Sequence, residues 1–292
     1  MKKILLNGCS FVAGDALTWD THFPDINWMK HVFYKKLHPT YSSKQICEFS
    51  LEYKFNLRPK DNLRGQLEKL LKVDVIDIST DGNSNDNIAM STIGFLTSLS
   101  PNERKQYHIC IGWTELTRRI KWVEEHNHFF NLHHSHLNDI QYKGYAGFIK
   151  ESIINPHDLD HVYNFFKNIF MLQCYLKLNG ISFTFWKSLG DPGQPNDITE
   201  IDSVFSRNRK NGCIPFEQET CFDANDWLTL NNDASDWITC NNNNRCPWLE
   251  KSWGYYITSR KHFVSDDNRH PSLQAVIDFS LTVADRIKND VL

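Results

Sequence analysis

The sequence predicts an α/β fold in which helices cover both faces of a parallel sheet, a three-layer α/β/α arrangement. The first observation is a set of short apolar runs typical of buried strands, which lie near residues 4–6, 73–78, 107–111 and 181–186. The second observation is that segments with helical apolar spacing separate these runs. Strands that alternate with helices are joined by right-handed crossovers, and such connections produce a parallel sheet buried between two helical layers.

Each helix between or after the predicted strands carries one apolar face. We expect Asp61 to cap the first of them, Gly180 to end the long helix that begins near residue 159, and Pro271 to open the last. The positions expected on the sheet-facing sides are Leu63, Leu67, Leu70 and Leu71, then Ala89, Ile93 and Leu96, then Leu159, Val162, Phe166, Ile169 and Leu176, and finally Leu273, Ile277, Leu281 and Ala284.

The chain of 292 residues is predicted to be a single domain with two large insertions, near 113–158 and 190–261. The first insertion contains the histidines His126, His128, His133, His134 and His136. A metal site is one interpretation, because His133 and His136 can share a helix face. The alternative is an exposed polar insertion, since no carboxylate pattern completes a recognisable ligand set.

The second insertion is rich in Asn, Asp and Trp. Its segment 224–229 is echoed at 234–239, which places Trp227 and Trp237 in two similar turns. Tryptophan faces suit sugars or a protein partner, whereas the alternative is that this insertion packs onto the body of the domain. It also holds Cys213, Cys221, Cys240 and Cys246, which are candidate zinc ligands or, without any C-x-x-C pair, free thiols.

Composition excludes several classes of function. The net charge of −3 is spread over both signs, so no basic surface favours nucleic acid as a partner. No apolar run has membrane-spanning length, and Asn7-Gly8 makes the apolar start too short for a signal peptide. We therefore expect a cytoplasmic protein, with Cys9, Cys110 and Cys174 as reduced thiols in or beside the core.

Three polar motifs flank predicted core elements. Ser10 follows the first strand in the segment Asn7-Gly8-Cys9-Ser10, and a loop from Asp81 to Asp86 follows the second. Asp267 and His270 stand three apart just before the last helix. In open α/β sheets, ligands bind outside the carboxyl ends of the strands, where Ser10 is predicted to lie. A serine hydroxyl becomes a nucleophile when a base takes its proton and a third group orients that base.

The order of these motifs resembles the SGNH (GDSL-like) hydrolase family, with Gly8-Cys9-Ser10 as the first motif and Asp-x-x-His as the last. The resemblance implies a flavodoxin-like strand order. It also implies a catalytic triad in which Ser10 attacks an ester carbonyl, His270 transfers the proton and Asp267 orients the imidazole. Cys9 replaces the acid that the family has before its serine.

The resemblance further implies an oxyanion hole built from the backbone N–H groups of Ser10 and Gly82 and from one side chain. The family's third motif, G-x-N-D, supplies an Asn side chain, but here Thr114 occupies that position in Gly112-Trp113-Thr114-Glu115. We expect the missing amide to come from Asn83 or Asn85 instead, with a loop-structural role as the alternative. Arg118 and Arg119 are candidates for binding an anionic substrate group or, alternatively, belong to a solvated helix face.

The sequence thus predicts a serine esterase that removes acyl groups such as acetate from a carbohydrate or a similar small ester, without a cofactor or metal. The G-C-S-F and G-W-T motifs resemble divergent bacteriophage members of the family, which implies a host-cell or virion-associated location. One alternative is a non-catalytic glycan- or protein-binding module, such as a virion structural protein, on the same fold. The other alternative is a sugar O-acyltransferase. The oligomeric state does not follow from the sequence.

Overall fold

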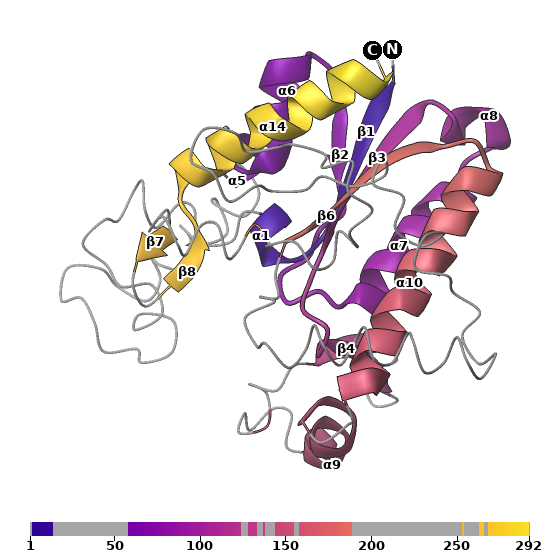
Figure 1. Ribbon diagram of the computed structural model, residues 1–292, viewed down its shortest axis with the longest axis vertical. Helices are drawn as coiled ribbons and strands as arrows, with labels where there is room; N and C mark the ends of the chain where they lie inside the picture. Colours follow the sequence, from indigo (N-terminus) through magenta and orange to yellow (C-terminus); the bar gives the residue numbers. More distant parts are fainter. Residues whose placement is uncertain are drawn as a thin grey trace.

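A four-stranded, all-parallel sheet lies at the centre of the structure (Figure 1). The computed structural model describes residues 2–13, 58–123, 128–132, 137, 144–154, 158–188, 253, 263–265 and 268–291. The strand order is β2 (Val75–Asp77), β1 (Lys3–Asn7), β3 (Tyr107–Trp113) and β6 (Ser182–Lys187). In chain order this is 2-1-3-4, as in the first four strands of flavodoxin-like sheets. The four predicted strands and their parallel arrangement are therefore confirmed.

The strands are apolar on both faces because helices cover both. Ile4, Leu6 and Cys110 point to one side of the sheet, and Leu5 and Ile109 point to the other. This alternation follows from the two-residue period of a strand. It explains why the sequence shows continuous apolar runs at β1 and β3 rather than an apolar–polar alternation.

The first face is covered by α6 (Leu63–Leu71) and α14 (Leu273–Val291), which pack against each other (Figure 1). Leu63, Leu67 and Leu71 are buried as predicted. The cap differs from the prediction, because Asn62 rather than Asp61 caps α6 and accepts a hydrogen bond of 3.1 Å from Gly65 N–H. Asp61 instead ends the short helix α5 (Arg58–Asp61).

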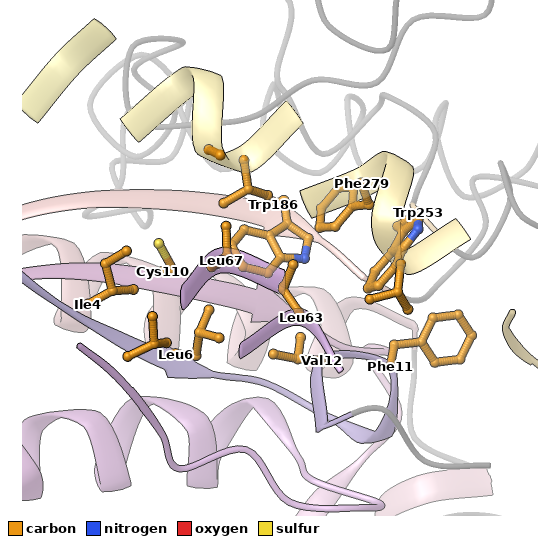
Figure 2. Packing of buried hydrophobic residues seen from close by; sticks show 14 of the residues in the cluster. Ile4, Leu6, Phe11, Val12, Leu63, Leu67, Cys110, Trp186, Trp253 and Phe279 are labelled. Carbon is orange, nitrogen blue, oxygen red and sulfur yellow. The ribbon is translucent and has the colours of Figure 1, made fainter. Parts of the chain in front are cut away.

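The start and the buried face of α14 also differ from the prediction. Pro271 ends the short strand β8 (Asn268–Pro271), and the Ser272 hydroxyl accepts from Ala275 N–H at the start of α14. Leu281 is 47% exposed, although it was expected to face the sheet. Leu273 and Ala284 pack against the core as predicted. The other residues of α14 that face the core are Ala275, Val276, Phe279, Val283 and Ile287. This face of α14 is buried because Phe279 stacks on Trp253, with ring centroids 4.1 Å apart, and packs edge-on against Trp186 (Figure 2).

The second face is covered by α7 (Asn85–Thr97) and α10 (Asp158–Leu178). Figure 1 shows these two helices side by side on the opposite side of the sheet from α6 and α14. Ala89 and Leu96 of α7 are buried as predicted, and α10 ends two residues before Gly180, which has a φ of +63°. A single turn, α8 (Pro101–Arg104), leads into β3. Among the described residues, no helix is long and apolar enough to span a membrane.

The first predicted insertion contains an antiparallel hairpin of β4 (Arg119–Val123) and β5 (His128–Leu132). It is followed by α9 (Ala146–Ile149) and the π-helical turn η5 (Lys150–Ile154). Leu132, Ile149 and Ile153 form a small apolar cluster of their own. Of the five histidines, only His128 falls within the described residues, as the first residue of β5.

Most of the second predicted insertion lies outside the described residues, including Trp227, Trp237, Cys213, Cys221, Cys240 and Cys246. Trp253 is its one described residue, and it is fully buried between Phe279 and Phe11 (Figure 2). At that position the insertion packs onto the body of the domain. After it, β7 (Phe263–Ser265) and β8 form an antiparallel ribbon that leads to α14.

Candidate active site

Ser10 is the first residue of α1 (Ser10–Ala13), a single turn that begins three residues after β1 ends. The turn forms because the Cys9 carbonyl oxygen accepts hydrogen bonds from the N–H groups of Val12 and Ala13, both at 3.0 Å. Val12 packs into the core and anchors the turn (Figure 2). Ser10 therefore lies at the carboxyl end of the sheet, as predicted, with 6% of its surface exposed.

The ends of β1 and β3 approach each other closely beside Ser10. A Cβ atom on Gly8 would lie 2.4 Å from Val12 Cγ2 and 3.0 Å from the Gly112 carbonyl oxygen. A Cβ atom on Gly112 would lie 2.3 Å from Ser188 Oγ and 2.6 Å from Val12 Cγ2. Both positions need glycine for space. Asn7 pairs with Ile111 across the strands, so this approach brings the residues after β3 next to the Cys9–Ser10 turn.

The loop at 79–84, which follows β2, is hydrogen-bonded to the backbone just before Ser10. The Gly8 carbonyl oxygen accepts from Asn83 Nδ2 at 3.0 Å and from Thr80 N–H at 3.3 Å. Gly82 has a φ of +69° and is exposed, so the turn it makes suits glycine. The structure thus brings the predicted Gly82 loop together with the segment that precedes Ser10.

Both candidate asparagines use their amide hydrogens within the protein. Asn83 Nδ2 donates to Gly8 O and, at 3.5 Å, to Asn7 Oδ1. Asn85 Nδ2 donates to the carbonyl oxygens of Thr114 and Glu115 at 3.2 and 3.0 Å, and its Oδ1 accepts from Thr114 N–H at 2.9 Å. These are the loop-structural roles that the sequence left as the alternative. They argue against the expectation that either amide remains available to a substrate oxygen.

The hydroxyl of Thr114 differs from these two amides in its hydrogen bonding. Its side chain is fully buried, and among the described residues its hydroxyl has no hydrogen-bond partner of ordinary geometry. It lies beside the Cys9 thiol. Sulfur is a weak acceptor, so the hydroxyl keeps its capacity to donate to a stronger one.

Cys9 does not compete with Ser10 as a nucleophile. Burial raises the pKa of the Cys9 thiol, and the contacts that lower this pKa, from Arg118, the Phe11 backbone and Thr114, are smaller than the effect of burial. A thiol held in its neutral form is a poor nucleophile. Cys9 and Cys110 are both buried free cysteines, in agreement with the prediction that they act as small apolar groups.

His270 is brought to the neighbourhood of Ser10 by its strand. It lies on β8, and β8 contacts α1, the turn that Ser10 begins. The backbone over 268–271 is extended and pairs with β7. Pro271 favours this, since proline disfavours helical backbone at the residue before it. Asp267 lies outside the described residues.

Two polar residues near the site, Asn7 and Asn131, make contacts that were not predicted from the sequence. Asn7 is fully buried; its Nδ2 donates to Ile88 O, Ser91 Oγ and Thr92 Oγ1 of α7, and its Oδ1 accepts from Gly8 N–H. A polar residue that ends an apolar strand is the signal for such a role. Asn131 Oδ1, on the inserted hairpin, accepts from the N–H and hydroxyl of Ser84. Nothing in the local sequence around Asn131 predicts that contact.

Arg118 follows Thr114 in the turn between β3 and β4, and its side chain is only 12% exposed. Its Nε donates to Glu115 Oε2 at 3.1 Å, while among the described residues its buried Nη1 has no partner. Arg119, on β4, contacts His161 Nδ1 at 3.4 Å. The two arginines therefore lie in different settings and do not form a solvated helix face.

Within the described part of the chain, no group of His, Cys, Asp or Glu side chains is arranged to hold a metal ion. Comparison of the sequence with protein-family models and with curated proteins gives no match.

Proposed function

We propose that this protein is a serine esterase of SGNH type that hydrolyses acyl esters, for example acetyl esters, with carbohydrate esters among the candidate substrates. The observation that carries the proposal is the position of Ser10. It begins a turn at the carboxyl end of a central parallel strand, and the Gly82 loop, Thr114 and the strand bearing His270 gather around that turn. These are the places where the SGNH motifs put nucleophile, oxyanion donors and base.

In the proposed reaction, Ser10 Oγ attacks the ester carbonyl carbon while His270 takes the hydroxyl proton, and Asp267 orients the imidazole. The carbon–oxygen bond to the alcohol then breaks, and the alcohol leaves with the proton from His270. Water attacks the acyl-serine, gives its proton to His270, and releases the carboxylic acid. Ser10 regains its proton, so the cycle needs no other reactant.

The negative oxygen formed in each step requires donors placed in advance. We assign this role to the backbone N–H groups of Ser10 and Gly82 and to the Thr114 hydroxyl. Thr114 is preferred over Asn83 and Asn85 because, among the described residues, its buried hydroxyl has only the weakly accepting Cys9 thiol beside it, whereas both amides are engaged. This order reverses the one expected from the sequence.

The test is hydrolysis of a panel of short acyl esters by the wild-type chain and by Ser10→Ala. We expect wild-type turnover and loss of nearly all of it in Ser10→Ala, with thermal stability almost unchanged. Cys9→Ser is the matched control for a neighbouring change and should retain activity. Wild-type protein that is inactive on every acyl ester would instead favour the non-catalytic binding module.

A further inference from the structure

Arg118 holds a largely buried positive charge, and within the described part of the chain one of its buried donor atoms has no acceptor. An arginine side chain stays protonated in proteins and offers five N–H donors. Glu115 accepts from Nε at 3.1 Å, but the buried Nη1 donates to none of the described residues. Leaving a buried donor on a charged group without an acceptor is costly, so such an atom indicates an acceptor supplied from outside.

Arg118 is held in place by the segment that also carries Thr114. Asn85 fixes that segment by binding the carbonyl oxygens of Thr114 and Glu115 and the Thr114 N–H. The segment continues from β3, whose end lies against Gly8 and the turn of Ser10. The Arg118 charge also lowers the pKa of the thiol of Cys9, the residue that precedes Ser10.

A second buried donor in the same segment, the Thr114 hydroxyl, lies beside the weakly accepting Cys9 thiol. The Thr114 hydroxyl is fully buried, and like Arg118 Nη1 it donates to none of the described residues in ordinary geometry. This segment thus carries two buried donors that have no ordinary acceptor among the described residues. The charged one, Arg118 Nη1, matches a ligand group with negative charge and strong acceptor oxygens.

From these contacts we propose that Arg118 binds an anionic group of the substrate, a carboxylate or a comparable oxyanion, beside Ser10. The substrate class then narrows from acyl esters in general to esters that carry a negative charge close to the ester bond. Arg118 acts as a specificity-determining residue, and Thr114 remains the donor to the oxygen formed in the reaction. The inference rests on the proposed function for the ester, but the anion site itself does not depend on turnover.

The experiment compares matched charged and neutral esters. 4-Nitrophenyl hydrogen succinate against 4-nitrophenyl butyrate puts the charge on the acyl side, and 3-carboxyphenyl acetate against phenyl acetate puts it on the alcohol side. For at least one pair, we expect the charged-to-neutral ratio of kcat/KM to fall by roughly 10- to 100-fold in Arg118→Gln, the value of a charge-assisted hydrogen bond. Arg118→Lys, which keeps the charge, should retain part of the ratio.

Arg64→Gln is the matched control. Arg64 Nε also lies 3.1 Å from a glutamate oxygen, that of Glu68, but the Arg64 side chain is 38% exposed on α6. Both ester ratios should be unchanged in this variant. If the Arg118→Gln chain fails to fold, the wild-type ratios decide: a wild type that prefers neither charged ester overturns the proposal.

A binding measurement separates this inference from the esterase proposal. Inorganic phosphate is titrated calorimetrically at constant ionic strength into wild type, Arg118→Gln and Arg64→Gln. We expect binding to wild type and Arg64→Gln that is weakened roughly 10-fold or more in Arg118→Gln. Arg118-dependent binding without ester turnover would retain the anion site and reject the esterase. Ester turnover with equal phosphate binding and equal ester ratios in wild type and Arg118→Gln would reject the anion site.

Discussion

Asn83 Nδ2 donates a 3.0 Å hydrogen bond to the carbonyl oxygen of Gly8, two residues before Ser10. This bond ties the loop after β2 to the turn after β1, and both ends of it are buried. The side chain that the sequence marked as a donor to substrate is thus a donor to the backbone that carries the proposed nucleophile. Asn83 is therefore a positioning residue.

Asn83→Ala should lower both stability and activity. The change leaves the buried Gly8 carbonyl with one fewer donor and Asn7 Oδ1 without its Asn83 contact, a loss of about 1–3 kcal/mol in the free energy of unfolding. The free energy of unfolding, measured with denaturant, and kcat should both decrease. Asn179→Ala is the control, since Asn179 Nδ2 donates to the Tyr175 carbonyl at 2.7 Å at the end of α10. A large loss of kcat with unchanged stability would place the Asn83 amide in the oxyanion hole after all.

Thr114→Val should separate activity from stability. The substitution keeps the shape of the side chain and removes a buried hydroxyl that no described residue binds in ordinary geometry. The free energy of unfolding should stay equal or rise, whereas kcat should fall by about 10²-fold with little change in KM. Thr114→Ser, which keeps the hydroxyl, should retain most of kcat. Unchanged kcat in Thr114→Val would remove Thr114 from the oxyanion hole.

Gly112→Ala should destabilise the protein by about 1–3 kcal/mol, because the added methyl would meet Ser188 Oγ at 2.3 Å and Val12 Cγ2 at 2.6 Å. Gly94→Ala is the matched control, since nothing lies within 4 Å of a Cβ there and Gly94 is inside α7. It should stabilise the protein by about 0.5–1 kcal/mol. Thermal unfolding of both variants checks the pair. Equal effects of the two changes would contradict the close approach of β3 to α1.

The pH dependence of stability should carry a contribution from His108. Its ring contacts the hydroxyls of Ser182 and Thr184 at 3.1 and 2.9 Å. Burial lowers the pKa of His108 to about 3, helped by the positive charges of Lys2 and Arg286. An unfolded histidine has a pKa near 6.5, so between these values only the unfolded chain binds the proton. The contribution of His108 to the free energy of unfolding is therefore fully present well above pH 6.5. Below that pH it is lost at up to about 1.4 kcal/mol per pH unit.

The measurement for His108 is the free energy of unfolding between pH 7 and pH 5, in wild type and in His108→Gln. Glutamine has no proton to gain in this range, so the variant should show a smaller slope than wild type, whatever its absolute stability. Identical slopes would mean that His108 titrates normally in the folded chain.

The sequence predicted the sheet well because its signals are local. Continuous apolar runs and one-face helices such as Leu63, Leu67 and Leu71 read directly as buried strands and covering helices. The buried face of α14 was predicted correctly at Leu273 and Ala284 but not at Leu281, because this helix has apolar residues on more than one side. The choice between the two stripes was made by Trp253, which comes from a distant segment and stacks on Phe279.

The site was predicted in part for the same reason. The positions of Ser10 and the Gly82 loop follow from strand ends, which the sequence shows. The hydrogen-bond partners of the side-chain amides cannot be read from the sequence in this way. Asn83 reaches Gly8, and Asn85 reaches Thr114, only because the strands pair in the order β2-β1-β3. That Arg118 Nη1 has no acceptor in the described ranges likewise depends on how its segment packs rather than on its neighbours in sequence.

Covalent labelling tests directly whether Ser10 is an activated nucleophile, on which the proposed esterase depends. The wild-type chain, Ser10→Ala and His270→Ala are treated with a fluorophosphonate probe, and the modified residue is located by mass spectrometry of peptides. We predict a phosphonyl adduct on Ser10 that is lost in Ser10→Ala and reduced in His270→Ala. Two results would contradict the activation of Ser10: a folded wild-type chain that takes up no probe at Ser10, or a labelling rate at Ser10 that His270→Ala does not change.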